Sequence, residues 1–294
     1  MHPTATAHTS LQRGKALLTL IRPRQWIKNS FVLAPLLFTG QFMSLPAVTS
    51  AVIAALLFCL ASSAVYIVND LHDIDKDRQH PVKAHKRPLA NGTLEKRHAV
   101  ALLALLYLLL AGAWYLGQQA VVAVAITYML LNLAYSFWLK HQPVIDIFTI
   151  AIGFVLRVYA GAAALSVPLS SWMFVTTLCL ALYLAAIKRR QELASNGDRS
   201  RNVLRYYSPE LIDRYAEMSA TGAVLFYSLF VMNTHPKLVV TIPLVLYGMF
   251  RYWFIVARNN AGESPTDALL SDWQLLATVA LWGAASLFVL WPQP

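Results

Sequence analysis

Long apolar runs alternate with short charged segments along almost the whole chain. A membrane-spanning helix needs about 20 mostly apolar residues to cross roughly 30 Å of hydrocarbon. Runs of about this length cover residues 29–44, 48–69, 98–116, 119–138, 143–165, 170–187, 218–234, 238–257 and 273–291. The pattern therefore predicts an all-α integral membrane protein with nine transmembrane helices.

Composition supports this class, because 57% of the 294 residues are hydrophobic and only 13% are charged. The two longest hydrophilic stretches, about 70–97 and 188–217, are too short to form a core of their own. We expect one transmembrane domain over residues 1–294, preceded by a short cytoplasmic tail of about residues 1–20.

The distribution of charge predicts the orientation of the bundle. Lys and Arg residues gather before the first predicted span, between the second and third, and after the sixth, whereas the loops near 45, 117 and 167 carry none. Loops rich in Lys and Arg stay in the cytoplasm. The N-terminus and both hydrophilic stretches should thus be cytoplasmic, and the net charge of +10 needs no nucleic-acid partner.

An acidic segment follows the second predicted span. At 3.6 residues per turn, Asn69, Asp70, Asp73 and Asp77 share one face of a helix, whereas Asp75 points elsewhere. Clustered carboxylates repel one another unless a cation lies among them. Oxygen ligands without clustered Cys or His favour Mg²⁺. The spacing predicts Asn69, Asp73 and Asp77 as metal ligands and Asp70, Asp73 and Asp77 as catalytic residues.

Basic side chains follow this acidic face. Lys83, His85, Lys86 and Arg87 come directly after it and could hold phosphate oxygens that the metal leaves free. The simpler alternative is a solvated, salt-bridged cytoplasmic loop. Acidic and basic groups in this order favour a site for a magnesium-bound diphosphate.

The motif formed by Asn69, Asp70, Asp73 and Asp77 resembles the NDxxDxxxD signature of the UbiA superfamily of intramembrane prenyltransferases. The resemblance implies a UbiA-type helical bundle whose central cavity opens to the cytoplasm. Members of that superfamily typically carry a second acidic motif, DxxxD, after the sixth span. Here the segment reads LYLAAIKRRQELASNGD, in which Lys188, Arg189 and Arg190 precede Glu192 and Asp198.

Three further blocks resemble the decaprenyl-phosphate phosphoribosyltransferase branch of this superfamily. They are RPRQWIKN (22–29), HPVKAHKRPLANG (80–92) and NLAYSFWLKHQPVIDI (132–147). The resemblance implies Mg²⁺-dependent transfer of 5-phosphoribose from phosphoribosyl pyrophosphate to a polyprenyl phosphate, with release of diphosphate, towards a polyprenyl-phosphoryl arabinofuranose donor. It also implies a multi-pass protein of the bacterial inner membrane, in contact with membrane lipids, and leaves the oligomeric state open, a homo-oligomer included.

Several residues at the inner ends of the spans are expected to bind substrate. Lys28, Lys140 and Lys188 lie at the depth of a bound phosphate, although a lysine there can also mark the end of a helix by snorkelling. Arg157 lies deep in the fifth span, where a guanidinium faces a cavity or an ion-pair partner. The full set of expected substrate-binding residues is Lys28, Tyr66, Lys83, Arg87, Tyr135, Lys140, Arg157, Lys188 and Arg189.

Two alternatives remain open at this point. A UbiA-type prenyltransferase with an aromatic or porphyrin acceptor is the nearest one, and the missing second DxxxD motif argues against it. A transporter or channel would carry charged residues near mid-bilayer on several helices, whereas only Arg157 lies that deep.

Overall fold

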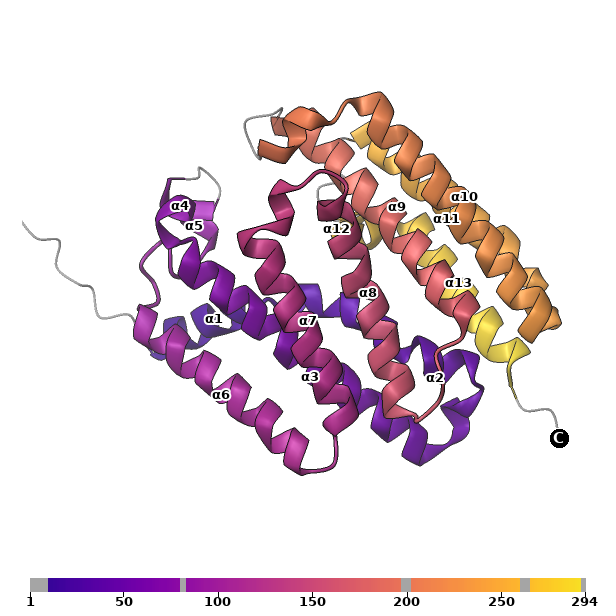
Figure 1. Ribbon diagram of the computed structural model, residues 1–294, viewed down its shortest axis with the longest axis horizontal. Helices are drawn as coiled ribbons and strands as arrows, with labels where there is room; N and C mark the ends of the chain where they lie inside the picture. Colours follow the sequence, from indigo (N-terminus) through magenta and orange to yellow (C-terminus); the bar gives the residue numbers. More distant parts are fainter. Residues whose placement is uncertain (1–9, 80–82, 197–201, 260–264, 292–294) are drawn as a thin grey trace, which may run out of the picture.

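The computed structural model describes residues 10–79, 83–196, 202–259 and 265–291, and this part of the chain is helical and contains no strand (Figure 1). The long helices are α3 (Leu45–His72), α6 (Lys96–Tyr115), α7 (Gln119–Phe137), α8 (Ile145–Ala164), α9 (Ser171–Asn196), α10 (Pro209–Thr234), α11 (Ile242–Asn259) and α13 (Trp273–Val289). The short α-helices are α1 (Ser10–Ile21), α2 (Ala34–Phe38), α4 (Ile74–Arg78), α5 (Lys83–Lys86) and α12 (Pro265–Ser271). Short 3₁₀ segments are η1 (Pro23–Leu33), η2 (Gln41–Met43), η3 (Leu139–His141), η5 (Asn202–Tyr206) and η6 (Pro236–Thr241).

Seven helical segments within the described residues are long and apolar enough to cross a membrane. They are Leu45–His72, Lys96–Tyr115, Gln119–Phe137, Ile145–Ala164, Ser171–Ala194, Pro209–Thr234 and Pro236–Arg258. The apolar helix α13 is shorter, at 17 residues. The integral membrane class and the all-helical fold predicted from the sequence are thus confirmed.

The first predicted span, 29–44, is not one continuous helix. It is divided among η1, α2 and η2. Pro35 has no amide hydrogen to continue an α-helical ladder, and Gly40 turns the chain with a φ of +69°. The segment also lies against α8, where a Cβ on Gly161 would be only 1.9 Å from the carbonyl oxygen of Val32. Hydrophobicity predicted the position of this segment, but local backbone chemistry decided its form.

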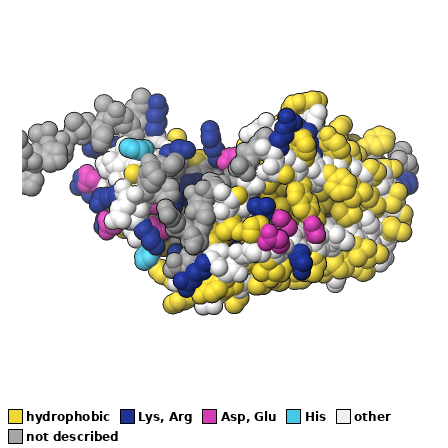
Figure 2. Space-filling model, turned by 90° about the horizontal axis from the view of Figure 1, so that it is seen from above, with side chains coloured by type: hydrophobic (Ala, Val, Ile, Leu, Met, Phe, Trp, Pro, Cys, Tyr) yellow, Lys and Arg dark blue, Asp and Glu magenta, His cyan; other side chains and the backbone are white. Residues whose placement is uncertain are grey.

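Successive long helices run in opposite directions, so the connections after α3, α7, α9 and α11 lie at the same end of the bundle (Figure 1). Seen from above this end, Lys, Arg, Asp and Glu side chains lie among the connections, and hydrophobic side chains cover much of the flank (Figure 2). We call this the polar end. Charge that is scattered along the sequence is thereby collected on one face.

Helix α8 lies at the centre of the fold, in contact with η1, α2, α3, α7 and α9. On one side, Val32, Phe58 and Tyr128 belong to one buried apolar cluster. On the other, Tyr183 and Ile212 belong to a second cluster formed mainly by α9, α10 and α11. A large cavity is lined by residues from both sides, among them Tyr128 and Tyr183.

Candidate active site

The acidic motif lies where α3 ends at the polar end of the bundle. Asp73 separates α3 from α4, yet the backbone bonds from Asp73 N–H to Asn69 O (2.9 Å) and from Asp77 N–H to Asp73 O (2.8 Å) keep the helical spacing. Ser136 on α7 donates a 2.7 Å hydrogen bond to Asn69 Oδ1. The junction therefore presents the motif with the four-residue period predicted from the sequence.

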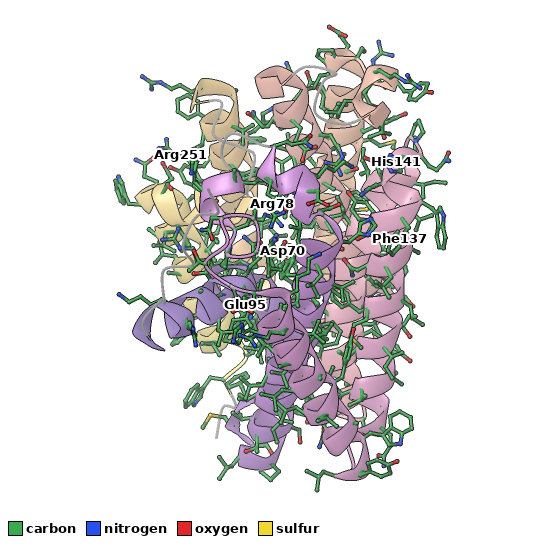
Figure 3. All side chains as sticks on the ribbon, turned by 90° about the vertical axis from the view of Figure 1, so that its left-hand side faces the viewer. Asp70, Arg78, Glu95, Phe137, His141 and Arg251 are labelled. Atoms are coloured by element: carbon green, nitrogen blue, oxygen red, sulfur yellow. The ribbon has the colours of Figure 1, made fainter. Side chains whose placement is uncertain are left out.

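Asp70 is nearly fully buried and is held by arginines from two distant segments. Nη2 of Arg22 lies 2.5 Å from Asp70 Oδ1, and Nη1 of Arg87 donates to the same oxygen. Figure 3 places Asp70 inside this end of the bundle, below Arg78. Burial lowers the pKa of Arg22, and burial together with the charge of Arg22 lowers the pKa of Arg87 to about 10. Asp70 thus gathers two guanidinium groups at one point.

Asp77 and Asp73 differ in their surroundings. Asp77 is within reach of Lys83 (3.7 Å from Nζ to Oδ1) and Arg87 (3.1 Å from Nη1 to Oδ2), but its buried Oδ2 accepts no hydrogen bond. Burial raises the pKa of Asp77, and the charge of Lys83 opposes this. Within the described ranges no side chain pairs with the Asp73 carboxylate. These two carboxylates therefore retain free oxygen atoms.

This donor set fits a magnesium ion. Its ligands would be carboxylate and amide oxygens, which Mg²⁺ prefers, and the buried Asp77 Oδ2 is an acceptor without a donor. No group of three or more His, Cys, Asp or Glu side chains is gathered for a metal among the residues that the structure describes. Asp70, by contrast, is paired with Arg22 and Arg87.

A cavity of about 830 Å³ lies beside the acidic motif. Of the expected substrate-binding residues, it is lined by Lys28, Tyr66, Tyr135, Arg157 and Lys188. Its remaining walls come mainly from apolar side chains of η1, α2, α9, α10, α11 and α13. Tyr66 connects the cavity to the acidic site, because the Arg22 guanidinium lies 4.6 Å from the centre of its ring.

Arg157 faces this cavity and is held by neutral acceptors. It donates to Asn29 Oδ1 (2.9 Å from Nε), to the Gly153 carbonyl (2.7 Å from Nη1) and to the Tyr128 hydroxyl (3.0 Å from Nη2). The ring of Tyr128 also lies 4.7 Å from its guanidinium carbon. The ion-pair alternative for this residue is not observed in the described part of the chain, and the positive charge remains available to the cavity.

Arg189 occupies a different environment from the one predicted. Its side chain is fully buried, with Nε 2.6 Å from Asp146 Oδ2, Nη1 2.5 Å from Glu192 Oε2, and Nη2 2.7 Å from the Tyr135 hydroxyl. Tyr207 donates a further 2.7 Å hydrogen bond to Asp146 Oδ1. The expectation that Arg189 binds a phosphate is therefore corrected: enclosed by carboxylates and without solvent access, Arg189 orients Tyr135, which lines the cavity.

Neighbouring basic residues also separate into distinct roles. Arg190 pairs with Asp213 on α10 (3.1 Å), and Lys140 lies on η3 outside the residues that line the cavity. Lys188 faces the cavity and is 4.0 Å from Glu192. Asp198, the last acidic position of the expected second motif, lies outside the described residues.

Three important residues were not assigned from the sequence. Arg22 and Asn29 both belong to the RPRQWIKN block but carried no predicted contact, and Tyr128 lies within an apolar span. Asn29 is buried and joins three elements, since Nδ2 donates to Ser62 Oγ (3.3 Å) and Cys59 Sγ (3.2 Å) while Oδ1 accepts from Arg157. The sequence offered little to indicate these contacts, because Asn29 is only the first residue of the predicted span 29–44 and its burial is a property of the tertiary structure.

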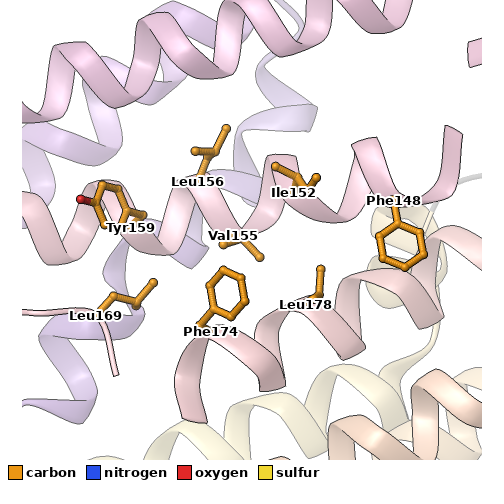
Figure 4. Close-up of a pocket in the computed structure, with 8 residues that line it drawn as sticks. All are labelled: Phe148, Ile152, Val155, Leu156, Tyr159, Leu169, Phe174 and Leu178. Carbon is orange, nitrogen blue, oxygen red and sulfur yellow. The ribbon is translucent and has the colours of Figure 1, made fainter. Parts of the chain in front are cut away.

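A second hollow lies between α8 and α9. Figure 4 shows its lining, which consists of Phe148, Ile152, Val155, Leu156, Tyr159, Leu169, Phe174 and Leu178 around about 550 Å³. Phe148, Ile152, Tyr159 and Phe174 are each exposed by 41–49%. Only Tyr159 contributes a polar side-chain atom, so this hollow offers packing for apolar chains and no reactive group.

Several known proteins are similar to this chain. Residues 31–266 match the UbiA prenyltransferase family. The decaprenyl-phosphate phosphoribosyltransferase of Mycobacterium tuberculosis (strain H37Rv) is 35% identical over 91% of this chain and 93% of that protein, and the one of Mycolicibacterium smegmatis is 36% identical over 79% and 74%. A UbiA homologue from Archaeoglobus fulgidus, bound to GPP and Mg²⁺, has a similar fold, with a TM-score of 0.70 at 21% identity over 94% of this chain and 99% of that one. The chain therefore belongs to the UbiA prenyltransferase family.

Proposed function

We propose that this protein transfers 5-phosphoribose from phosphoribosyl pyrophosphate to a polyprenyl phosphate and releases diphosphate. The observation that carries the proposal is its 35% identity, over 91% of its length, to a decaprenyl-phosphate phosphoribosyltransferase. The site supports this assignment, because the segment expected to carry a second acidic motif instead supplies Lys188 to the cavity. Transfer between a phosphorylated sugar donor and a lipid phosphate requires more fixed positive charge than transfer from a prenyl diphosphate to an uncharged aromatic acceptor does.

The reaction exchanges one bond at C1 of the ribose for another. The C1–O bond to diphosphate breaks and its electron pair leaves with the diphosphate, while an oxygen of the lipid phosphate forms the new bond to C1. The acceptor oxygen is already anionic, so no general base is required. The protein supplies orientation and positive charge, and in-line attack inverts the configuration at C1.

The acidic end of α3 provides the place for the leaving diphosphate. Asn69, Asp73 and Asp77 would hold Mg²⁺, which when bound supplies positive charge to the diphosphate oxygens. Arg22 and Arg87, gathered by Asp70, and Lys83 would hold the oxygens that remain. In this arrangement Asp70 is a positioning residue, and Asp73 and Asp77 contact the donor through the metal.

We further propose that nine segments cross the membrane and that the cavity opens to the cytoplasm. The first crossing would be the broken segment 29–44, and the eight apolar helices would form the other eight. The polar end carries the basic loops that the positive-inside rule assigns to the cytoplasm. The bacterial relatives support a place in the bacterial inner membrane, where the lipid product would serve synthesis of polyprenyl-phosphoryl arabinofuranose for the cell envelope.

A transfer assay tests the activity directly. Purified protein in detergent receives phosphoribosyl pyrophosphate labelled in the ribose, together with a polyprenyl phosphate, and the organic phase is analysed for a labelled lipid. We expect a labelled product that requires Mg²⁺ and is lost on addition of EDTA.

The prenyltransferase alternative is assayed in parallel with a prenyl diphosphate and an aromatic acceptor. Absence of ribosylated lipid together with prenylated product would overturn the proposed activity. Ribosylated lipid without prenylated product would support it.

A further inference from the structure

The basic residues near the site form two spatially separate groups. Arg22, Lys83 and Arg87 contact the carboxylates of the acidic motif. Lys28, Arg157 and Lys188 instead line the large cavity, and come from η1, α8 and α9 respectively. One reaction centre therefore has two sets of cations, and only the first set is accompanied by the acidic residues expected to hold magnesium.

The cavity group has the character of a site for a phosphate monoester. Arg157 is 4% exposed, and all three of its hydrogen bonds go to neutral oxygens. Burying a guanidinium without a carboxylate is costly unless an anion completes the site. Burial and the nearby charges of Lys188 and Arg157 also lower the pKa of Lys28 to about 7, as expected where cations crowd together before an anion binds.

The shape of the cavity indicates what the anion is attached to. Beyond the cations, the cavity is walled by aromatic side chains that include Phe38, Tyr227, Phe230 and Trp282. The ring of Phe38 lies 5.1 Å from that of Phe230 and 6.1 Å from that of Trp282. Together these rings form an aromatic wall along α2, α10 and α13, away from the acidic motif. A cavity that has cations in one region and an apolar wall in the rest is complementary to an amphiphile with a single charged end.

We propose that Lys28, Arg157 and Lys188 bind the phosphate of the lipid acceptor, and that its first isoprene units lie against the aromatic wall formed by Phe38, Tyr227, Phe230 and Trp282. This inference rests on the proposed function and assigns one of its two substrates to a place. A cavity of about 830 Å³ is of the size that encloses a drug-sized ligand. It therefore holds the head of the lipid, and the rest of a long polyprenyl chain extends into the bilayer.

Kinetics distinguish binding of the lipid phosphate by these cations from binding of the 5-phosphate of the donor. We expect Lys28→Met and Lys188→Met to raise the KM for polyprenyl phosphate at least about tenfold, as for loss of one hydrogen bond to a charged group. The KM for phosphoribosyl pyrophosphate should remain within about twofold of wild type. Arg190→Met is the matched control, because Arg190 lies two positions after Lys188 on the same helix but pairs with Asp213 outside the cavity.

Binding without turnover gives an independent readout. Farnesyl phosphate and farnesol are titrated into the full-length wild-type protein and the three variants in detergent, by calorimetry. Wild type and Arg190→Met should bind farnesyl phosphate at least about tenfold more tightly than Lys28→Met and Lys188→Met do. Farnesol should bind all four proteins alike.

The outcomes distinguish this inference from the proposed function. If the wild type ribosylates lipid but both lysine variants bind farnesyl phosphate normally, or if only the KM for phosphoribosyl pyrophosphate changes, the subsite assignment is wrong and the activity stands. If the wild type forms no ribosylated lipid yet binds farnesyl phosphate through these lysines, the activity is wrong and the subsite stands.

Discussion

Arg189 and Asp146 form an ion pair in which both side chains are fully buried, with Nε of Arg189 2.6 Å from Oδ2 of Asp146. The pair joins α9 to α8, and Arg189 also bonds the Tyr135 hydroxyl on α7 at 2.7 Å. Three helices that line the large cavity are thereby tied together behind its wall. This contact explains why a basic residue in the expected second acidic motif does not itself reach the cavity.

We predict that Asp146→Ala lowers stability strongly, because it leaves the Arg189 charge buried without this partner. Breaking a buried ion pair typically costs about 3–5 kcal/mol. The midpoint of thermal unfolding in detergent, followed by size-exclusion chromatography, should fall by many degrees. The double variant Asp146→Leu with Arg189→Met should recover part of the loss, and a single variant as stable as wild type would contradict the structural role.

Asn29→Asp tests the charge of Arg157 while keeping its acceptor oxygen. The carboxylate would pair with Nε of Arg157, which now bonds Asn29 Oδ1 at 2.9 Å, and would cancel the charge offered to the cavity. Loss of a charged hydrogen bond to substrate is worth about 1.5–3 kcal/mol, so the KM for polyprenyl phosphate should rise about 10- to 150-fold. Initial rates measure this, and an unchanged KM would show that Arg157 does not act on the acceptor.

Asp73→Asn should abolish most of the activity and retain the fold, because Asp73 carries a carboxylate that the described residues leave unpaired. Removing a group that stabilises charge in the transition state commonly costs about 100- to 1,000-fold in kcat. Asp75→Asn is the control, since Asp75 is 90% exposed and pairs only with Arg78 among the described residues. Near-normal turnover of the Asp73 variant would remove this residue from the metal site.

Asp70→Asn should release the arginines that one carboxylate oxygen now gathers. Arg22 and Arg87 both contact Asp70 Oδ1. The KM for phosphoribosyl pyrophosphate should then rise by about tenfold, with little change in the KM for the lipid. Arg87→Met should reproduce the effect and Arg78→Met should not, because Arg78 pairs with the exposed Asp75. A selective rise in the lipid KM would argue against this division of roles.

Acceptor binding should weaken as pH rises through about 7. Burial and the positive charges of Lys188, Arg157 and Arg22 lower the pKa of Lys28 to about 7. The negative charge of Asp267 on α12 opposes this lowering. Lys28 is charged below its pKa, and an anion prefers the charged form, so affinity for the lipid phosphate is retained below pH 7 and lost above it. Lys28→Arg should flatten the dependence of the acceptor KM between pH 7 and 9, and an equally steep profile in that variant would assign the titration to another group.

The sequence by itself determined the class of the protein and most of its elements. Eight of the nine predicted spans correspond to apolar helices, because a run long enough to cross a membrane leaves its backbone few alternatives to a helix. The four-residue spacing of Asn69, Asp73 and Asp77 likewise follows from chain geometry, since adjacent turns are covalently connected.

Tertiary structure decided the partners of the charged residues. Asp70 meets Arg22 and Arg87 across 48 and 17 positions of the chain, and Arg157 meets Asn29 across 128. A periodicity argument carries no information about such contacts, because it describes one helix at a time. Packing also placed Lys188 and its neighbour Arg189 in different environments, since Lys188 faces the cavity and Arg189 is enclosed among carboxylates. Side chains one position apart on a helix point about 100° apart. Only the surrounding helices determine which of these directions leads to the cavity.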